Sequence, residues 1–147
     1  MRVIMRERKN RKLLKETLCA LELMRGEAFI ARTKHEEVRS AIKEKQINRI
    51  YKLQDYADHR IKLYKEQYNE MLRSDKASKD DLLNECNQKI QGAVEFRDKA
   101  ISIVSSKCVE KLRRLQKRFD KDYKKLSMAC IGLNEQANSL LKADCGE

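Results

Sequence analysis

Hydrophobic residues recur every three or four positions along most of the chain. One series runs from Leu14 to Met71 and another from Leu83 to Leu140, each with 17 positions across 57 residues. The average step of about 3.56 residues lies between the 3.5 of a heptad coiled coil and the 3.6 of a straight α-helix. The pattern therefore predicts two long amphipathic helices that supercoil only slightly.

A polar stretch, SDKASKDD at residues 74–81, separates the two series. Ser78 and Asp81 resemble a capping box, in which side chains three residues apart satisfy the open N–H groups of a helix start. Because short connections favour antiparallel neighbours, we predict an all-α fold, a long antiparallel two-helix hairpin of coiled-coil type. It should form a single domain over residues 1–147, with helices at about 5–73 and 80–143 and a turn at 74–79. Self-association into a helical bundle stays open.

The two series mirror each other about Ala77. Folding the chain there places Ile42 opposite Leu112 and Met71 opposite Leu83 along the predicted seam, the line on which the two helices pack. Two consecutive four-residue steps also coincide, at Ile42, Gln46 and Ile50 in the first series and at Leu112, Cys108 and Val104 in the second. An interruption in one helix must be matched in its partner for the seam to stay closed, so the symmetry supports the hairpin.

Apolar residues also lie outside the predicted seam, and most of these are in the half nearest the turn. A two-helix seam is narrow, and exposed apolar patches usually mark contact with another chain. The alternative is that the helices have wide apolar stripes that cover these residues. We predict a partner-binding surface, for a second copy or a different helical protein, at Leu53, Tyr56, Leu63, Phe96, Ala100 and Ile103. A smaller group in the other half consists of Leu18, Phe29 and Ile30.

The net charge of +11 is concentrated in two places, residues 1–15 and residues 107–125, each contributing +6. The first has the composition of a nuclear localisation signal or polyanion-binding tail, and equally that of a solvated helix end. The second can neutralise phosphates without reading sequence, because no base-reading module accompanies it. The candidate residues for binding polyanions or acidic protein surfaces are Arg6, Arg8, Lys9, Arg11, Lys12, Lys111, Arg113, Arg114, Lys117, Arg118 and Lys121.

His35 occupies a seam position opposite Phe119, and His59 lies far from it in the sequence. Neither has a cysteine at metal-ligand spacing, so we interpret His35 as a polar seam residue that fixes register. No metal, cofactor or small-molecule substrate is expected. The chain has no Gly-rich phosphate loop, GxSxG or HExxH motif, and a two-helix hairpin offers no concave pocket, so we expect no enzyme.

Five cysteines without a CxxC pair favour a reducing compartment, and Cys145 is expected to be the most accessible thiol. No apolar run is long enough to span a bilayer, and no secretory hydrophobic region follows residue 1. These features predict an intracellular protein of the cytoplasm or nucleus.

Three hypotheses about function follow. The first is a structural or scaffolding coiled-coil protein, a subunit of a cytoskeletal or chromosome-associated assembly. The second is a non-specific DNA- or RNA-binding protein that uses the basic clusters. The third, a membrane-surface module, ranks last because the chain is short for a three-helix module of that kind and no Trp or Phe marks a lipid-facing edge.

Overall fold

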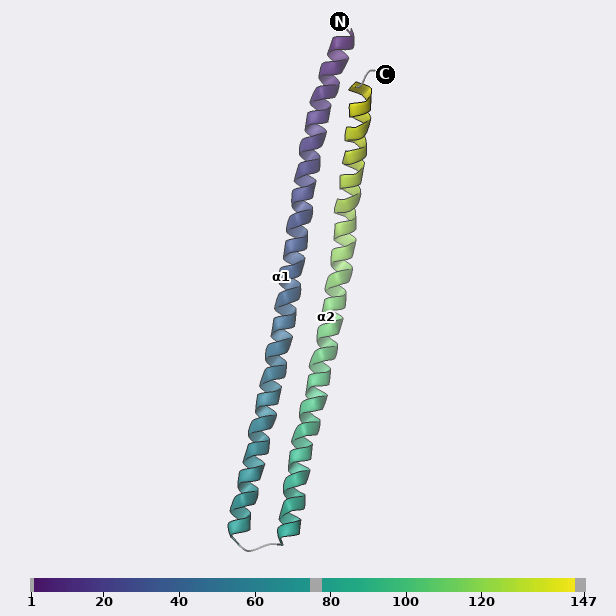
Figure 1. Cartoon of the computed structure of the whole chain (residues 1–147). Coiled ribbons are helices and arrows are strands. Elements are labelled where there is room, and N and C mark those ends of the chain that lie inside the picture. Colours follow the sequence, from purple (N-terminus) through teal and green to yellow (C-terminus); the bar gives the residue numbers. More distant parts are fainter. Residues whose placement is uncertain (1, 75–77, 145–147) are drawn as a thin grey trace. The chain divides into compact units, whose positions relative to one another are not determined.

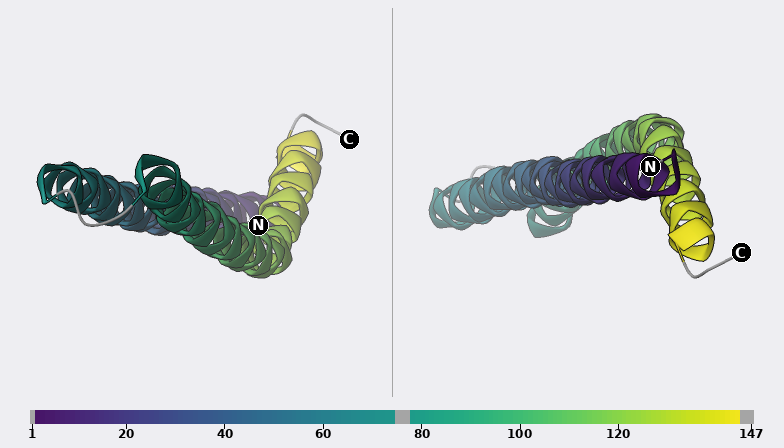
Figure 2. Two further views of the ribbon diagram at one scale, coloured as in Figure 1. Left: turned by 90° about the horizontal axis from the view of Figure 1, so that it is seen from below. Right: turned by 90° about the horizontal axis from the view of Figure 1, so that it is seen from above.

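The computed structural model describes residues 2–74 and 78–144. Helix α1 spans Arg2–Arg73 and helix α2 spans Lys79–Asp144, and the two pack against each other as a helical hairpin (Figure 1). The predicted all-α hairpin is therefore confirmed. Viewed from either end, the described part of the chain contains these two helices and no strand (Figure 2). The predicted turn axis at Ala77 lies outside the described residues.

Local hydrogen bonds explain where the helices end. The backbone N–H and the hydroxyl of Ser74 both donate to the carbonyl of Met71, at 3.2 and 2.9 Å, which closes the last turn of α1. The Ser78 carbonyl accepts from the Leu82 N–H at 3.1 Å, as an N-cap residue does. Asp80 and Asp81 occupy the first turn of α2, where negative charge complements the helix dipole. The helix start thus follows directly after the serine of the predicted capping box.

The packing contacts group into two units, and each pairs a segment of α1 with a segment of α2. Unit 1 combines Met1–Arg39 with Arg113–Glu147, and unit 2 is Ser40–Leu112. Both helices run without interruption through the boundary between the units. Each unit is described separately below.

In unit 1 the seam is built from small or polar side chains and one leucine. Leu21, Ala28 and Ala137 are buried, together with Thr17 and His35. The Thr17 hydroxyl donates to the Leu13 carbonyl at 2.8 Å, so its burial leaves no unsatisfied donor. All five residues occupy positions in the predicted series, so the heptad-like spacing identified this part of the seam correctly.

In unit 2 the predicted seam is wrong next to the turn. Leu82 and Cys86 are buried, whereas Leu83 is 43% exposed and Asn87 is also exposed. The predicted series would have required burial of the Asn87 amide, which costs free energy unless it finds a partner. The structure instead buries the Cys86 thiol, whose sulfur lies 3.6 Å from the Tyr64 carbonyl in donor geometry.

Candidate functional site

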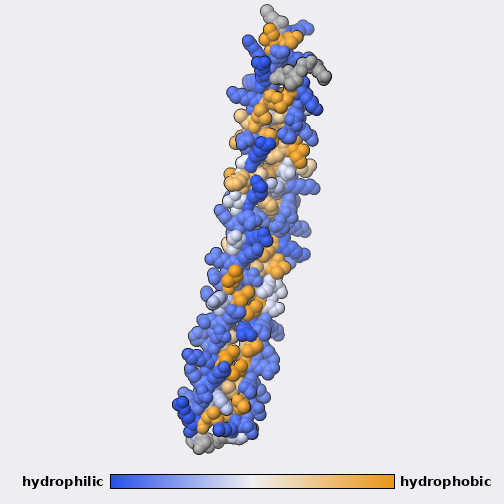
Figure 3. Space-filling model, viewed as in Figure 1, coloured by the Kyte–Doolittle hydropathy of each residue, from blue (hydrophilic) through white to orange (hydrophobic). Residues whose placement is uncertain are grey.

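The two helices cover only part of their apolar surface. The buried apolar residues are mostly alanines and cysteines, while many large hydrophobic side chains of the described chain remain exposed. Figure 3 shows hydrophobic side chains reaching the surface among hydrophilic ones on the face in view. Exposed apolar area on this scale is typical of a surface that contacts another chain.

One of these exposed regions, in unit 2 around Tyr56 and Phe96, contains a ring contact between the two helices. Tyr56 is 54% exposed and Phe96 57% exposed. Their ring centroids lie 6.4 Å apart with an interplanar angle of 63°, an edge-to-face contact between α1 and α2. Unit 2 thus presents an edge-to-face aromatic pair at its surface.

A groove of about 270 Å³ lies beside this aromatic pair, and we call it the Tyr56–Phe96 groove. Its small residues are Ala57, Gly92 and Ala93, which come from both helices. A Cβ atom added at Gly92 would meet nothing within 4 Å, so the space above this glycine is open. The small residues therefore leave room between the helices for a side chain from outside.

The remaining lining residues of the groove are Arg60, Tyr64 and Lys89. The Arg60 guanidinium carbon lies 5.2 Å from the Tyr64 ring centroid, and the Lys89 Nζ lies 5.9 Å from it. Both are at cation–π distance. Lys89 also pairs with Glu85 at 3.4 Å, so this side of the groove carries charges of both signs.

The predicted partner-binding residues divide into two groups. Tyr56, Leu63, Phe96 and Ile103 are exposed, whereas Leu53 and Ala100 are half-buried. Of the six, the structure brings Tyr56 and Phe96 into ring contact. Their role in binding stays a prediction. Gly92 was not among the predicted residues of this surface. An interior helix glycine beside apolar residues can nevertheless indicate a close packing contact or a functional position.

In unit 1 the predicted smaller group is also exposed. Leu18 is 47%, Phe29 64% and Ile30 57% exposed. Leu23, which the sequence reasoning omitted, is 71% exposed and belongs to the same helix. These four residues lie on two different sides of α1, Leu18 with Phe29 and Leu23 with Ile30, and the ring contacts of the described residues give Phe29 no aromatic partner from α2.

The predicted polyanion-binding residues are all exposed. The N-terminal group, Arg6, Arg8, Lys9, Arg11 and Lys12, lies in unit 1. Lys111 belongs to unit 2, whereas Arg113, Arg114, Lys117, Arg118 and Lys121 belong to unit 1. Arg113 and Arg114 already take part in polar interactions within the chain. Exposure permits contact with an acidic partner but does not identify one.

Each of the two histidines forms a hydrogen bond within the chain. His35 is buried at the seam and its Nε2 donates to the Gln116 side-chain oxygen at 3.2 Å. His59 is exposed and its Nδ1 donates to the Asp55 carbonyl at 2.8 Å. Among the described residues, no three His, Cys, Asp or Glu side chains come together where they could hold a metal ion. Nor is any helix in the described ranges long and apolar enough to cross a membrane.

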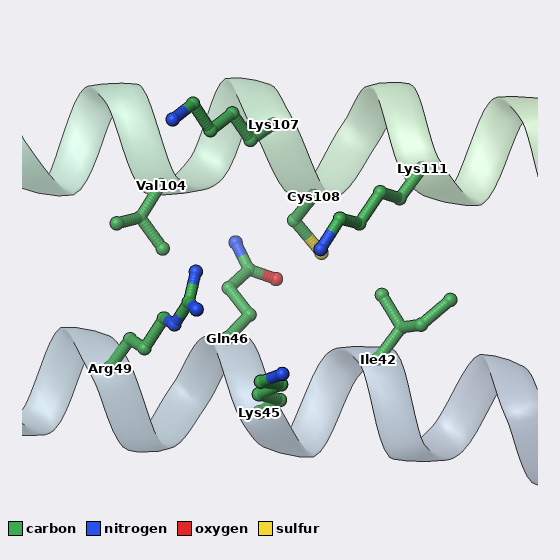
Figure 4. A pocket seen from close by; sticks show the side chains of 8 residues that line it. All are labelled: Ile42, Lys45, Gln46, Arg49, Val104, Lys107, Cys108 and Lys111. Atoms are coloured by element: carbon green, nitrogen blue, oxygen red, sulfur yellow. The ribbon is translucent and has the colours of Figure 1, made fainter.

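A second pocket, which the sequence reasoning missed, lies in unit 2 between Ile42 and Lys111 (Figure 4). Four basic side chains line it, from both helices: Lys45, Arg49, Lys107 and Lys111. The sequence feature that could have indicated this pocket is Gln46, a polar residue at a seam position with Lys45 before it and Arg49 three residues later. In comparisons with protein-family models, curated proteins and solved structures, nothing matches the chain.

Proposed function

We propose that the protein is a non-enzymatic structural subunit that assembles with a second copy of itself through the Tyr56–Phe96 groove. The observation that carries this proposal is the groove itself, with two half-exposed aromatic rings beside small residues. A helix packs on other helices by placing side chains into holes between four residues, and the open space above Gly92 has the character of such a hole. Two hairpins joined in this way would form a four-helix arrangement.

Burial of the aromatic pair supplies the driving force for this assembly. Removing a large apolar side chain from water contributes about 1.5–3 kcal/mol, and Tyr56 and Phe96 are each still more than half exposed. Aromatic anchors in a small central cluster commonly contribute most of the binding energy of an interface. Leu63 and Ile103, which are 40% and 50% exposed, would extend the buried area.

The charges around the groove are compatible with a copy of the same chain. In a two-fold symmetric interface the same surface patch appears on both partners, so each cation must find an anion on that patch. Of the two cations that line the groove, Lys89 pairs at 3.4 Å with Glu85 next to it, and Arg60 lies over the Tyr64 ring and would need an anion from the second copy. The strongly basic residues 113–125 lie in unit 1, so they do not line the groove.

Light scattering coupled to size-exclusion chromatography tests this proposal on the full chain. Gly92→Leu fills the groove and raises helix propensity, so the variant should stay folded but lose association. Gly132→Leu is the matched control, because it places the same side chain in open space at another interior glycine of α2. A wild-type chain that is monomeric throughout the micromolar range, or equal association by both variants, would contradict the proposal.

Within a cell, we propose that the assembled hairpin serves a cytoskeletal or chromosome-associated structure in the cytoplasm or nucleus. The support for this step is the exposure of both basic clusters, because such structures present acidic surfaces. This cellular role is less specific than the assembly proposal, because an acidic protein and a nucleic acid would both attract the same basic side chains.

Non-specific nucleic-acid binding is the second candidate, favoured by one observation. All nine basic residues of the 107–125 stretch are exposed along α2. Binding to a DNA or RNA duplex should weaken steeply with salt, because each neutralised phosphate releases counterions. Charge reversal at Lys117 and Arg118 should reduce both the affinity and the salt dependence. The absence of binding near physiological salt would exclude this function.

A further inference from the structure

The pocket shown in Figure 4 gathers positive charge where the two helices of unit 2 meet. Two of its cations, Lys45 and Arg49, come from α1, and two, Lys107 and Lys111, come from α2. Its volume is about 60 Å³, several times the space that one ordered water needs. A single tetrahedral oxyanion fits a space of this size, whereas a nucleobase does not.

No carboxylate lines the pocket. The other four lining residues are Ile42, Val104, Cys108 and Gln46, so the only neutral polar groups are an amide and a thiol. The four cations are exposed to solvent, so each attracts an anion only weakly by itself. The pocket instead places several positive charges around one small space without a carboxylate among its lining residues.

The four cations also lack the ion pairs that basic residues make elsewhere on the same helices. Arg25, Arg39 and Lys89 each pair with a glutamate three or four residues away. Within the described ranges, none of the four pocket cations has a carboxylate within 4.0 Å. These four side chains therefore carry their charge without an ion pair to a described carboxylate.

The spacing of these cations costs stability in the absence of an anion. Lys45 and Arg49 are four residues apart on α1, and Lys107 and Lys111 are four residues apart on α2. Like charges at this spacing destabilise a helix. Figure 4 shows Arg49 and Lys111 beside the gap between the helices, whereas the Lys107 side chain runs along α2 away from α1, so an anion in the gap would lie nearest to Arg49 and Lys111.

The side-chain directions suit an anion held from both helices. Figure 4 shows the Gln46 amide directed across the gap toward α2, with Arg49 and Lys111 on either side of it. A guanidinium offers two parallel N–H donors to an oxyanion, an ammonium adds a compact charge, and an amide nitrogen adds a neutral donor. Three different donor types from two helices thus surround one space.

We propose that this pocket binds a phosphate-class oxyanion, either free or as a phosphoryl group of a small polyphosphate. The occupied site would join α1 to α2 at the level of Gln46, where the seam contains a polar residue. This role is independent of the Tyr56–Phe96 groove, because the two sites share no lining residue. The anion would act as a reversible clamp on unit 2.

Calorimetric titration of the full chain with tripolyphosphate and with inorganic phosphate tests the proposal at constant ionic strength. The pocket variant is Arg49→Gln with Lys111→Gln. The matched control is Lys62→Gln with Arg73→Gln, which removes the same charge from exposed residues of the same helix hairpin that do not line the pocket and belong to neither basic cluster. Losing charge-assisted hydrogen bonds from two donors should raise the dissociation constant at least about tenfold in the pocket variant. The control should change it less than about twofold, because its two charges lie outside the pocket and act on the anion only through screened, long-range attraction.

Two further arms separate the explanations. Gln46→Leu keeps all four cations but removes the amide donor, and it should weaken binding while the chain stays folded by circular dichroism. A short single-stranded oligonucleotide supplies phosphodiesters in place of compact phosphate, and it should not compete with tripolyphosphate at the pocket. Equal loss in the pocket and control variants, unchanged binding by Gln46→Leu, or displacement of tripolyphosphate by the oligonucleotide would overturn the proposal.

Discussion

The imidazole of His35 on α1 stacks on the ring of Phe119 on α2, with centroids 4.1 Å apart and an interplanar angle of 19°. Phe119 stacks in turn on Tyr123 at 5.2 Å, and the Arg32 guanidinium carbon lies 6.0 Å from the Tyr123 ring centroid. With the hydrogen bond from His35 to Gln116, these contacts give unit 1 a specific cluster of aromatic and polar side chains at its seam.

The His35–Phe119 stack should contribute measurable coupling energy. Aromatic pairs add about 0.5–1.5 kcal/mol beyond the area they bury, and a double-mutant cycle isolates that term. We expect His35→Ala and Phe119→Ala each to destabilise the chain, and the double variant to lose about 1 kcal/mol less than their sum. Urea unfolding followed by circular dichroism measures all four proteins. Strict additivity would show that the rings merely lie close together.

The sequence allowed the prediction that His35 lies opposite Phe119, because both residues belong to long apolar series that mirror each other about Ala77. A regular helix keeps the same register over many turns, so one turn position fixes distant pairs. Near the turn the same reasoning failed. Leu82 and Leu83 are adjacent, so periodicity alone could not tell which of the two is buried. Burial of Leu83 would also bury the Asn87 amide, which is unfavourable, and the structure buries Leu82 instead.

The exposed apolar residues and the basic pocket were predictable only in part. An exposed aromatic such as Phe96 follows from its place outside the seam, so the sequence identified it. The pocket at Gln46 depends on which side chains from two helices converge, and this requires the register and the rotamers together. Lys45 and Arg49 alone look like ordinary solvated charges. The basic pocket becomes apparent only when Lys107 and Lys111 of α2 are known to line the same space.

Leu82 and Leu83 provide a matched test of the seam next to the turn. Leu82 is 8% exposed and Leu83 is 43% exposed, although both are leucines in the first turns of α2. Truncation of a buried leucine costs about 2–5 kcal/mol, so Leu82→Ala should destabilise by about 2 kcal/mol in this narrow seam. Leu83→Ala should cost less than about 1 kcal/mol. The free energy of unfolding in urea measures both, and the reverse order would restore the originally predicted register.

The cysteines should differ sharply in their reaction with a thiol reagent. Cys19 is exposed, whereas Cys86 and Cys108 are buried, and Cys145 lies outside the described residues. A buried thiol reacts only when the structure opens locally, and each ~1.4 kcal/mol of opening free energy slows labelling about tenfold. In single-cysteine versions of the native chain, Cys19 should react almost as fast as in urea. Cys86 and Cys108 should react slowly, and rapid labelling of either would show that unit 2 opens readily.

Three interior helix glycines should each reveal a stabilising substitution. A Cβ added at Gly26, Gly92 or Gly132 would meet nothing within 4 Å, so alanine adds no clash at any of them. Alanine is favoured over glycine in a helix interior by about 1 kcal/mol. We expect each single substitution to raise the free energy of unfolding by up to that amount. Gly26→Ala and Gly92→Ala should combine additively, because Gly26 belongs to unit 1 and Gly92 to unit 2. Urea unfolding at a chain concentration too low for self-association tests this, and destabilisation by any of the three substitutions would contradict it.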